Sequence, residues 1–295
     1  MSPPRPTGHA AAPQLFDAAV LQERMASMPH VVPSLLHTFS RQDSEIEMAC
    51  VALMRRRHPG WTVAALHERR RRGAFEEGIT GSAVLGAWHC LSALAEEGGV
   101  FVDASCIMLR HTSSWMDCTS DALQGFACLL HDDMPEAWAL AAPPGHALVV
   151  AWRDELAAAI RMGLDEHDLP AAYCASEAVQ QVCSHELREQ LPARFMHAAW
   201  CSVRARLPDA ECQLRSSIAC GGPYHHLEEA GWRSRAALLR VLSLEEEELE
   251  NTPLIRFRQH EISRMPPLGA LGQRGSYVAR VLGGALLLDT LDQER

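Results

Sequence analysis

The positions of the apolar residues predict helices along most of the chain. Between breaks of proline, glycine and serine, apolar side chains recur three and four residues apart, which places them on one face of a helix. Two short apolar runs, residues 100–103 and 104–109, fit a strand as well as a helix. The predicted helices are Gln14–Met28, Ser44–Arg57, Val63–Arg72, Ser82–Ala95, Ser120–His131, Ala147–Met162, Ala172–Gln190, Ala193–Arg206, Asp209–Ala219, His226–Leu242 and Ser276–Leu291. The pattern predicts a mainly α fold, an irregular multi-helix globular bundle with room for one or two short strands.

Proline and glycine positions divide the chain into three predicted parts. Residues 1–13 are rich in proline and alanine, and we expect them to form a disordered leader. Residues 14–265 are expected to fold as one helical globular domain. A linker rich in proline and glycine begins at Pro266, and within residues 266–295 it leaves the last helix as a C-terminal packing element.

The composition is that of an ordinary globular protein. Of the 295 residues, 47% are hydrophobic and 22% are charged, which is enough apolar material for a sizeable core. No run of about 20 apolar residues could span a bilayer, and residues 1–13 lack the apolar stretch of a secretion signal. The ten cysteines are scattered, unlike the disulfide framework of a small secreted domain. We therefore expect an intracellular, cytoplasmic protein with free thiols and no membrane span.

All 27 basic residues are arginine, so the chain contains no lysine. A chain of this length would ordinarily hold roughly 15 lysines. Two explanations are open. One is the base composition of a GC-rich genome, which replaces lysine codons by arginine codons. The other is selection against ubiquitin attachment in a protein that acts in the cytoplasm or nucleus of a host cell. Lysine is required for a Schiff base with pyridoxal phosphate, for Walker-A nucleotide hydrolysis and for ordinary kinase catalysis. These mechanisms are excluded, and we expect no cofactor.

Two runs of arginine form a dense basic segment in a chain whose formal net charge is −10. The first run ends one predicted helix and the second ends the next. These residues are Arg55, Arg56, Arg57, Arg69, Arg70, Arg71 and Arg72. The simplest interpretation is two solvated helix ends, since arginine complements the negative end of the helix dipole. As a binding surface, the arginine cluster would contact a protein partner, in particular an acidic one, or a nucleic acid.

Cys90, His146 and Asp154 follow one another in the order of a nucleophile, its base and an orienting carboxylate, with Asp165 as the alternative carboxylate. A catalytic thiol needs a base that converts it to the thiolate, and the base needs a third group that orients it. This order resembles that of papain-like enzymes, and the resemblance implies a cysteine-dependent hydrolase or transferase. A cysteine in the apolar helix predicted at residues 82–95 is equally a common core residue.

A second candidate site is the acidic motif at residues 129–136, which resembles the first aspartate-rich motif of isoprenyl diphosphate synthases. Its carboxylates are Asp132, Asp133 and Glu136. Paired carboxylates at the end of an apolar helix suit Mg²⁺, a cation that bridges protein oxygens and substrate phosphates. The resemblance implies a Mg²⁺-dependent isoprenyl or terpene synthase-like protein that uses Asp132 and Asp133. Carboxylates that flank a helix N-terminus, where negative charge is stabilised, are the structural alternative.

Because no catalytic constellation is complete, the sequence favours a binding protein. We expect a non-enzymatic helical interaction protein that acts by protein–protein binding, in the setting of a bacterial effector or viral protein inside a host cell. The cysteine-dependent enzyme built on Cys90 and His146 is the second hypothesis. The Mg²⁺-dependent synthase is the third.

Overall fold

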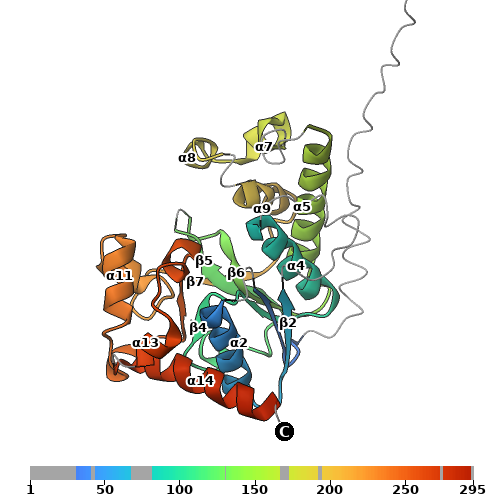
Figure 1. The fold of residues 1–295 in the computed structure, drawn as a ribbon. Helices are drawn as coiled ribbons and strands as arrows, with labels where there is room; N and C mark the ends of the chain where they lie inside the picture. Colours follow the sequence, from blue (N-terminus) through green and yellow to red (C-terminus); the bar gives the residue numbers. More distant parts are fainter. Residues whose placement is uncertain are drawn as a thin grey trace, which may run out of the picture.

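A computed structural model gives the fold of the chain (Figure 1). It describes residues 31–40, 44–67, 82–129, 131–166, 173–191, 195–272 and 275–293. The expected leader and the predicted helix Gln14–Met28 lie outside the described residues. Among the helices that are described, none combines the length and the apolar character needed to cross a membrane.

A mixed six-stranded sheet forms the centre of the molecule. In spatial order its strands are β2 (Thr62–His67), β1 (Leu35–Ser40), β3 (Gly99–Val102), β6 (Pro135–Ala142), β5 (Leu123–Ala127) and β7 (Cys212–Arg215). A separate two-stranded sheet pairs β4 (Cys106–Met108) with β8 (Leu254–Arg256). The prediction of a mainly α bundle is therefore wrong, and the protein has a mixed α/β fold.

Five of the six strands of the large sheet run in the same direction. Strand β1 is parallel to β2 and to β3, and β5 is parallel to β7. Strand β6 is antiparallel to both β3 and β5, so β3 and β5 share a direction. The carboxyl ends of β1, β3, β5 and β7 consequently meet at one edge of the sheet. We call this edge the carboxyl edge.

The chain crosses from one side of β1 to the other, so the connections of the strands diverge at β1. Helix α2 (Glu45–Arg57) connects β1 to β2, and α4 (Ser82–Glu96) leads from the β2 side to β3. The two helices pack in different hydrophobic clusters, with Leu53 of α2 in one and Leu91 of α4 in another. In open α/β sheets, ligands bind outside the carboxyl ends of the strands where the connections diverge in this way. That point lies between β1 and β3.

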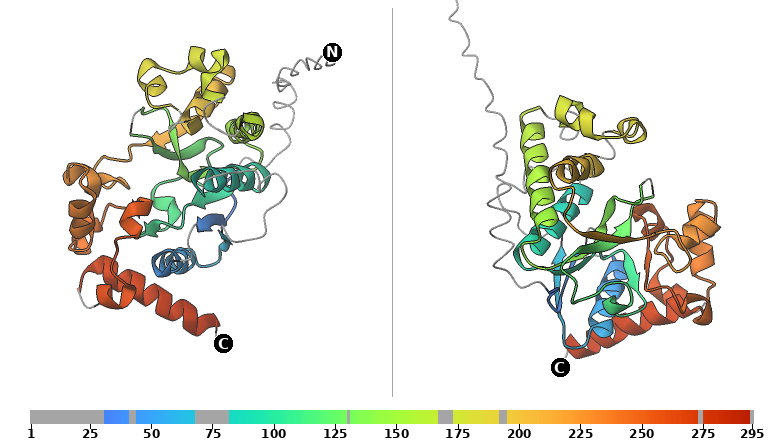
Figure 2. Two further views of the ribbon diagram at one scale, coloured as in Figure 1. Left: turned by 45° about the horizontal axis from the view of Figure 1, so that its top comes forward. Right: turned by 180° about the vertical axis from the view of Figure 1, so that it is seen from behind.

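Helices cover both faces of the sheet (Figures 1 and 2). Helices α4, α5 (Ala147–Glu166) and α9 (Phe195–Arg206) lie on one side, where the rings of Trp152 and Trp200 are 5.0 Å apart. Helices α2 and α14 (Tyr277–Gln293) pack against each other on the other side. The shorter helices are α7 (Glu177–Val182), α8 (His185–Arg188), α10 (His225–Glu229), α11 (Ser234–Val241), α12 (Gln259–Ile262), α13 (Leu268–Gly272), η1 (Thr112–Ser114) and η2 (Glu247–Leu249). The expected division of the chain at residue 266 stays a prediction.

Three of the predicted helices contain strands instead. The segments Val63–Arg72, Ser120–His131 and Asp209–Ala219 hold β2, β5 and β7, which are four to six residues long. Apolar runs of this length do not distinguish a strand from a helix, and the partner strands that decide the outcome lie elsewhere in the sequence. The predicted helices that correspond to α2, α4, α5, α9 and α14 are correct, whereas Ala172–Gln190 and His226–Leu242 each break into shorter helices. Ser44, for example, caps α2 by accepting a hydrogen bond from the N–H of Glu47 at 3.2 Å.

The turn between α4 and β3 requires glycine. Gly98 and Gly99 have φ values of +66° and +99°, in the region that disfavours residues with a Cβ atom. A Cβ atom on Gly99 would lie 2.4 Å from the carbonyl oxygen of Leu35, the first residue of β1. The absence of this atom lets β3 enter the sheet directly beside β1.

Gly99→Ala is expected to lower the free energy of unfolding more than Gly60→Ala. Gly60 also has a positive φ, +84°, but a Cβ atom there would meet nothing within 4 Å. The left-handed backbone alone costs an alanine about 1–2 kcal/mol, whereas Gly99→Ala adds a clash with the backbone of β1. Urea denaturation of both variants measures the difference. Equal losses would show that the close approach to Leu35 is unimportant.

His58, at the end of α2, is buried and bonded at both ring nitrogens. Its Nδ1 lies 2.8 Å from the carbonyl oxygen of Met54, and its Nε2 lies 3.1 Å from the backbone nitrogen of Thr112. A carbonyl accepts and an N–H donates, so Nδ1 carries the proton and Nε2 is the acceptor. Burial lowers the pKa of His58 to about 4, and the neutral ring connects α2 to η1.

The stability of the wild-type protein is expected to fall as the pH decreases from about 6.5 to about 4, in part through His58. In this window the unfolded state binds a proton at an ordinary histidine pKa, while the folded state does not. For one proton the slope approaches about 1.4 kcal/mol per pH unit. His58→Gln should reduce the slope in urea denaturation measured across this range, and His260→Gln, at an exposed histidine, should not. An unchanged slope in His58→Gln would contradict the assignment.

Candidate functional site

Asp103 is the first residue after β3, at the point between β1 and β3 where the connections diverge. Its backbone N–H donates to the carbonyl of Trp138 in β6 at 2.8 Å. The N–H of the next residue, Ala104, donates to the carbonyl of Phe39 in β1 at 3.2 Å. These bonds fix the carboxylate at the carboxyl edge, where only 3% of Asp103 is exposed.

Three donors converge on the Oδ1 atom of Asp103. They are the backbone N–H of Ser105 at 3.0 Å, the hydroxyl of Ser105, and Nη1 of Arg256 at 3.0 Å. The carboxylate and the guanidinium are both buried. Burial alone lowers the pKa of Arg256, but the Asp103 carboxylate raises it, and the net result is a pKa above the ordinary value. The pair is therefore a charged, buried link between β3 and β8.

Aromatic rings surround the guanidinium of Arg256. It lies 5.6 Å from the ring of Trp138, and the ring of Tyr224 meets Trp138 edge-on at 5.5 Å. Burial raises the pKa of Tyr224 above its ordinary value, so its hydroxyl stays protonated. We call Asp103, Ser105, Trp138, Tyr224 and Arg256 the Asp103 cluster.

A cavity of about 500 Å³ lies at the carboxyl ends of β5 and β7. Phe126 and Arg215, which pair in register at the ends of these two strands, line it. The polar part of the lining also includes Arg110, Ser114, Ser216, Glu250 and Asn251. This volume is typical of small-molecule sites, which occupy roughly 300–1,000 Å³. We call this space the edge cavity.

The edge cavity and the Asp103 cluster are in contact. Phe126, in the cavity wall, stacks on Trp138 with ring centroids 5.7 Å apart and an angle of 11°. Pro253, also in the wall, directly precedes β8, which carries Arg256. The buried ion pair therefore supports one wall of an open, polar cavity.

A second cavity of about 110 Å³ adjoins the first, and we call it the side cavity. The two cavities share a wall made of Cys220, Gly221, Gly222 and Asn251. Gly221 has φ +79°, and a Cβ atom there would lie 2.5 Å from the carbonyl oxygen of Asn251. The segment after β7 that contains Cys220, Gly221 and Gly222 therefore fits closely between the two spaces, and we call it the glycine loop.

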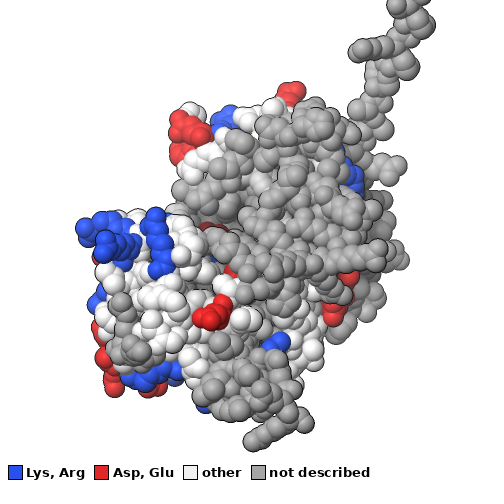
Figure 3. Space-filling view, in the orientation of Figure 1, with Lys and Arg blue, Asp and Glu red and all other residues white. Residues whose placement is uncertain are grey.

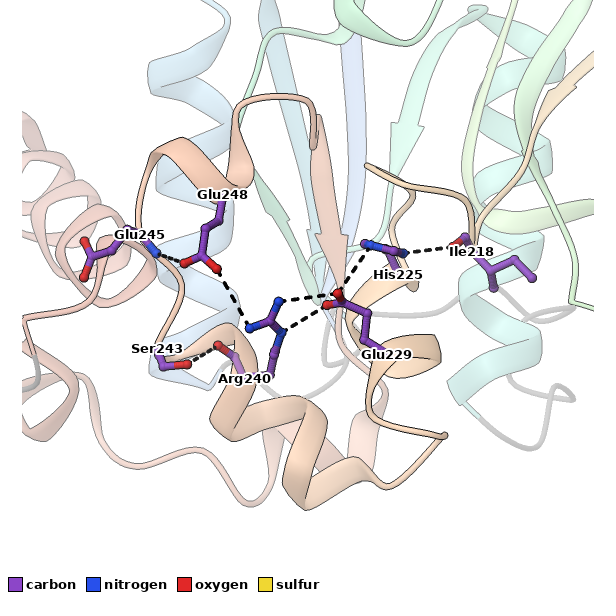
Figure 4. Close-up of polar contacts among 7 residues, drawn as sticks. All are labelled: Ile218, His225, Glu229, Arg240, Ser243, Glu245 and Glu248. Atoms are coloured by element: carbon purple, nitrogen blue, oxygen red, sulfur yellow. Dashed lines mark hydrogen bonds and ion pairs between the residues drawn. The ribbon is translucent and has the colours of Figure 1, made fainter.

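Charged side chains line the side cavity (Figure 4). Arg240 of α11 donates to Glu229 of α10 through Nε at 3.0 Å and through Nη2 at 3.4 Å. Nη1 of Arg240 lies 3.8 Å from Glu248, and Oε1 of Glu229 lies 3.8 Å from Nε2 of His225. The hydrogen bonds from Arg240 lower the pKa of Glu229, so this carboxylate stays ionised near neutral pH.

The structure does not bring Cys90, His146 and Asp154 into a catalytic arrangement. Cys90 is fully buried in α4, and Asp154 in α5 accepts a hydrogen bond from Nε of Arg153 at 2.9 Å. Burial raises the pKa of Cys90 well above its ordinary value and lowers the pKa of His146 to about 4. A protonated thiol and a neutral imidazole are the reverse of an activated pair. No hydrogen bond joins Cys90 to His146 in the part of the chain that is described.

The acidic motif lies in a turn between strands, so the helix predicted before it is wrong. Asp132 and Asp133 lie between β5 and β6, and Glu136 lies in β6. Nε1 of Trp200 in α9 donates to the carbonyl oxygen of Asp133 at 3.0 Å, which holds the turn against this helix. Among the described residues, no group of three or more histidine, cysteine, aspartate and glutamate side chains could hold a metal ion.

The predicted arginine cluster is described only in part. The arginines at 55–57 end α2 as expected, whereas those at 69–72 lie outside the described residues. Nη2 of Arg57 donates to the hydroxyl of Tyr277 in α14 at 3.4 Å. On the face drawn in Figure 3, arginines gather over α11, where Arg235 lines a cavity of about 420 Å³. Binding of a protein or nucleic acid by the arginine cluster stays a prediction.

Comparison with known proteins gives matches in structure alone. No protein-family model matches the chain, and no curated protein matches its sequence. The fold is similar to a structure titled PaToxG glycosyltransferase, with a TM-score of 0.37 and 11% identity over 90% of this chain and 93% of that chain. It is also similar to the apo-form glycosyltransferase GlyE of Streptococcus pneumoniae TIGR4, with a TM-score of 0.38 and 11% identity. That match covers 89% of this chain and 64% of the other.

The expectation of a non-enzymatic helical interaction protein is wrong, because it assumes a helical fold and the described chain is built on a six-stranded sheet. The papain-like alternative fails because the buried Cys90 is not activated. The synthase-like alternative fails because Asp132 and Asp133 lie in a turn between strands and not at the end of a helix.

Sequence reasoning missed the Asp103 cluster and the edge cavity. One local signal is present, because the Gly98–Gly99 turn, a three-residue apolar run and Asp103 together are typical of a buried strand with an acidic residue at its carboxyl end. By periodicity alone, residues 100–103 fit a strand and a helix equally well. Nothing in the sequence joins Asp103 to Arg256, which lies 153 residues later.

Asp103→Asn is expected to lower the free energy of unfolding by about 3–5 kcal/mol, because it leaves the buried guanidinium of Arg256 without its counter-ion. The matched control is Glu189→Gln, which breaks an exposed pair with His185 and should cost less than about 1 kcal/mol. Chemical denaturation at neutral pH compares the two. A loss below 1 kcal/mol in Asp103→Asn would show that the pair does not stabilise the fold.

Proposed function

We propose that this chain is an enzyme, a transferase whose donor substrate is a nucleotide-activated sugar bound in the edge cavity. The observation that carries the proposal is the position of this cavity. It lies at the carboxyl ends of two parallel strands in a sheet whose connections diverge at β1. In sheets of this kind the carboxyl ends are where nucleotides and other ligands bind.

The lining of the edge cavity suits an anionic, hydroxyl-rich ligand. Arg110 and Arg215 are exposed and supply the positive charge that a diphosphate requires. Nη1 of Arg215 donates to the carbonyl of Ser114 at 3.3 Å, which holds the guanidinium at the cavity wall. Glu250 and Asn251 add a carboxylate and an amide, and such groups hydrogen-bond to the hydroxyls of ribose and of a sugar.

Two adjoining cavities favour a reaction of two substrates. The side cavity shares the glycine loop with the edge cavity, so groups bound in the two spaces would be neighbours. Transfer of a group requires such a geometry, because the acceptor must lie against the activated carbon of the donor. The absence of lysine is compatible with this chemistry, which needs no Schiff base.

The proposal is tested by measuring equilibrium binding of uridine, guanosine and adenosine diphosphates by titration calorimetry, with and without Mg²⁺, which commonly accompanies diphosphates. At least one should bind. The nucleotide sugars of that nucleoside should then be consumed, with release of the diphosphate. The proposal fails if none of the three binds and no nucleotide sugar is turned over.

Arg215→Gln and Arg110→Gln are each expected to weaken binding of the nucleoside diphosphate by about 10-fold or more. The reason is that a charged hydrogen bond to phosphate contributes about 1.5–3 kcal/mol. Arg206→Gln is the matched control, since Arg206 is exposed on α9 and pairs with Glu155, which is not part of the cavity lining. Titration calorimetry of the three variants checks the prediction. Similar affinities in all three would place the diphosphate elsewhere.

A further inference from the structure

His225 lies beside the shared wall, in the lining of the side cavity. The volume of about 110 Å³ is well below the roughly 300–1,000 Å³ of sites that hold a whole small molecule. Such a space is too small for a nucleotide. It is large enough for one edge of a sugar or alcohol that enters from the edge cavity.

The hydrogen bond at Nδ1 sets the tautomer of His225. Nδ1 lies 3.2 Å from the carbonyl oxygen of Ile218 (Figure 4). A carbonyl oxygen only accepts, so we assign the proton to Nδ1, which leaves the lone pair on Nε2. The side chain is 35% exposed and therefore reachable by a ligand.

The distance between Glu229 and His225 suits a carboxylate that stabilises a charged imidazole ring without occupying its Nε2 atom. Its Oε1 is 3.8 Å from Nε2 of His225, longer than a hydrogen bond, so Nε2 remains open to a hydroxyl group. At this distance a carboxylate still stabilises a positive charge on the ring. The bidentate contact with Arg240 holds Glu229 in place.

Resting on the proposed function, we infer that the side cavity receives the hydroxyl group of the acceptor and that Nε2 of His225 is the general base that removes its proton. The hydroxyl oxygen forms a bond to the anomeric carbon of the donor while its proton moves to Nε2. The bond from that carbon to the diphosphate oxygen breaks, and its electron pair leaves with the nucleoside diphosphate. Glu229 and Arg240 are positioning residues, because they act through the ring.

The pH response of His225 depends on charges from several elements. The groups that face it or share its cavity are His226 and Glu229 of α10, Arg240 of α11, Glu248 of η2 and the thiol of Cys220 in the glycine loop. Burial lowers the pKa of His226 to about 4, so this neighbour is neutral at pH 5 and above. An acidic limb in a pH–rate profile measured above pH 5 would therefore not come from His226.

The test is the release of nucleoside diphosphate from the nucleotide sugar identified by calorimetry, with water and glycerol as probe acceptors, between pH 5 and 9. His225→Gln should reduce kcat by about 10²- to 10⁴-fold and remove the acidic limb, the usual effect of losing a general base. Its affinity for the nucleoside diphosphate should be unchanged. Glu229→Gln should reduce kcat and leave the affinity for the nucleoside diphosphate unchanged, because the ring loses the carboxylate that compensates the positive charge it acquires during transfer.

His185→Gln is the matched control. His185 forms the same type of pair, 3.7 Å from Glu189 four residues later, but on α8 and outside both cavities. It should leave the rate and the profile unchanged. If His225→Gln binds the nucleotide and keeps the rate and the acidic limb of the wild type, the inference is overturned and the proposed function stands. If the wild type neither binds nor consumes a nucleotide sugar, both fail together.

A measurement that needs no activity tests the geometry. Long-range ¹H–¹⁵N NMR of protein labelled at histidine should show the Nδ1–H tautomer for the His225 ring at high pH, assigned by its loss in His225→Gln. Addition of nucleoside diphosphate and glycerol should shift the Nε2 resonance. An Nε2–H tautomer would remove the lone pair from the cavity and overturn the inference.

Discussion

The ion pair between Asp103 and Arg256 is the interaction on which the architecture of the carboxyl edge depends. A buried charge without a partner costs several kcal/mol, so each of the two residues requires the other in place. Asp103 is fixed by β3, and Arg256 is carried by β8, whose partner β4 follows β3 closely in sequence. The pair thereby joins a segment in the first half of the chain to one near its end. Tyr224 packs on the same cluster and ends the glycine loop that separates the two cavities.

The arginines of this lysine-free chain occupy two environments with different consequences. Arg256 is buried, and its charge is compensated within the protein, so it has little capacity to bind a new anion. Arg110 and Arg215 are exposed in the wall of the edge cavity and keep their charge available. The rigid buried cation supports the wall, and the exposed cations face the cavity. A site for a diphosphate needs both, because exposed arginines bind tightly only where their backbone is held.

The sequence predicted the long helices and failed on the sheet, and the reason is physical. Helices α2, α4, α5, α9 and α14 are stabilised within their own segments, so apolar spacing and caps such as Ser44 reveal them. The short strands β2, β5 and β7 are stabilised by partners far away in the sequence. The candidate site could not be predicted for the same reason, because Phe126, Arg215 and Asn251 come together only when the sheet forms. Cys90 and His146 are residue types that are common in catalytic sites. Burial, which the sequence does not show, determines their protonation by raising the pKa of Cys90 and lowering that of His146.

His58 and His225 show how packing fits the same side chain to a structural role or to the chemical role proposed for His225. Both have Nδ1 next to a carbonyl oxygen, at 2.8 Å in His58 and 3.2 Å in His225. In His58 the other nitrogen accepts a backbone N–H and the ring is buried, so a proton can bind only by breaking the fold locally. In His225 the other nitrogen faces a cavity with a carboxylate nearby, so a proton can arrive and its charge is compensated. Residue type alone does not distinguish these two histidines. The difference is in what meets Nε2, and this is determined by the packing of α10 and α11 against the glycine loop.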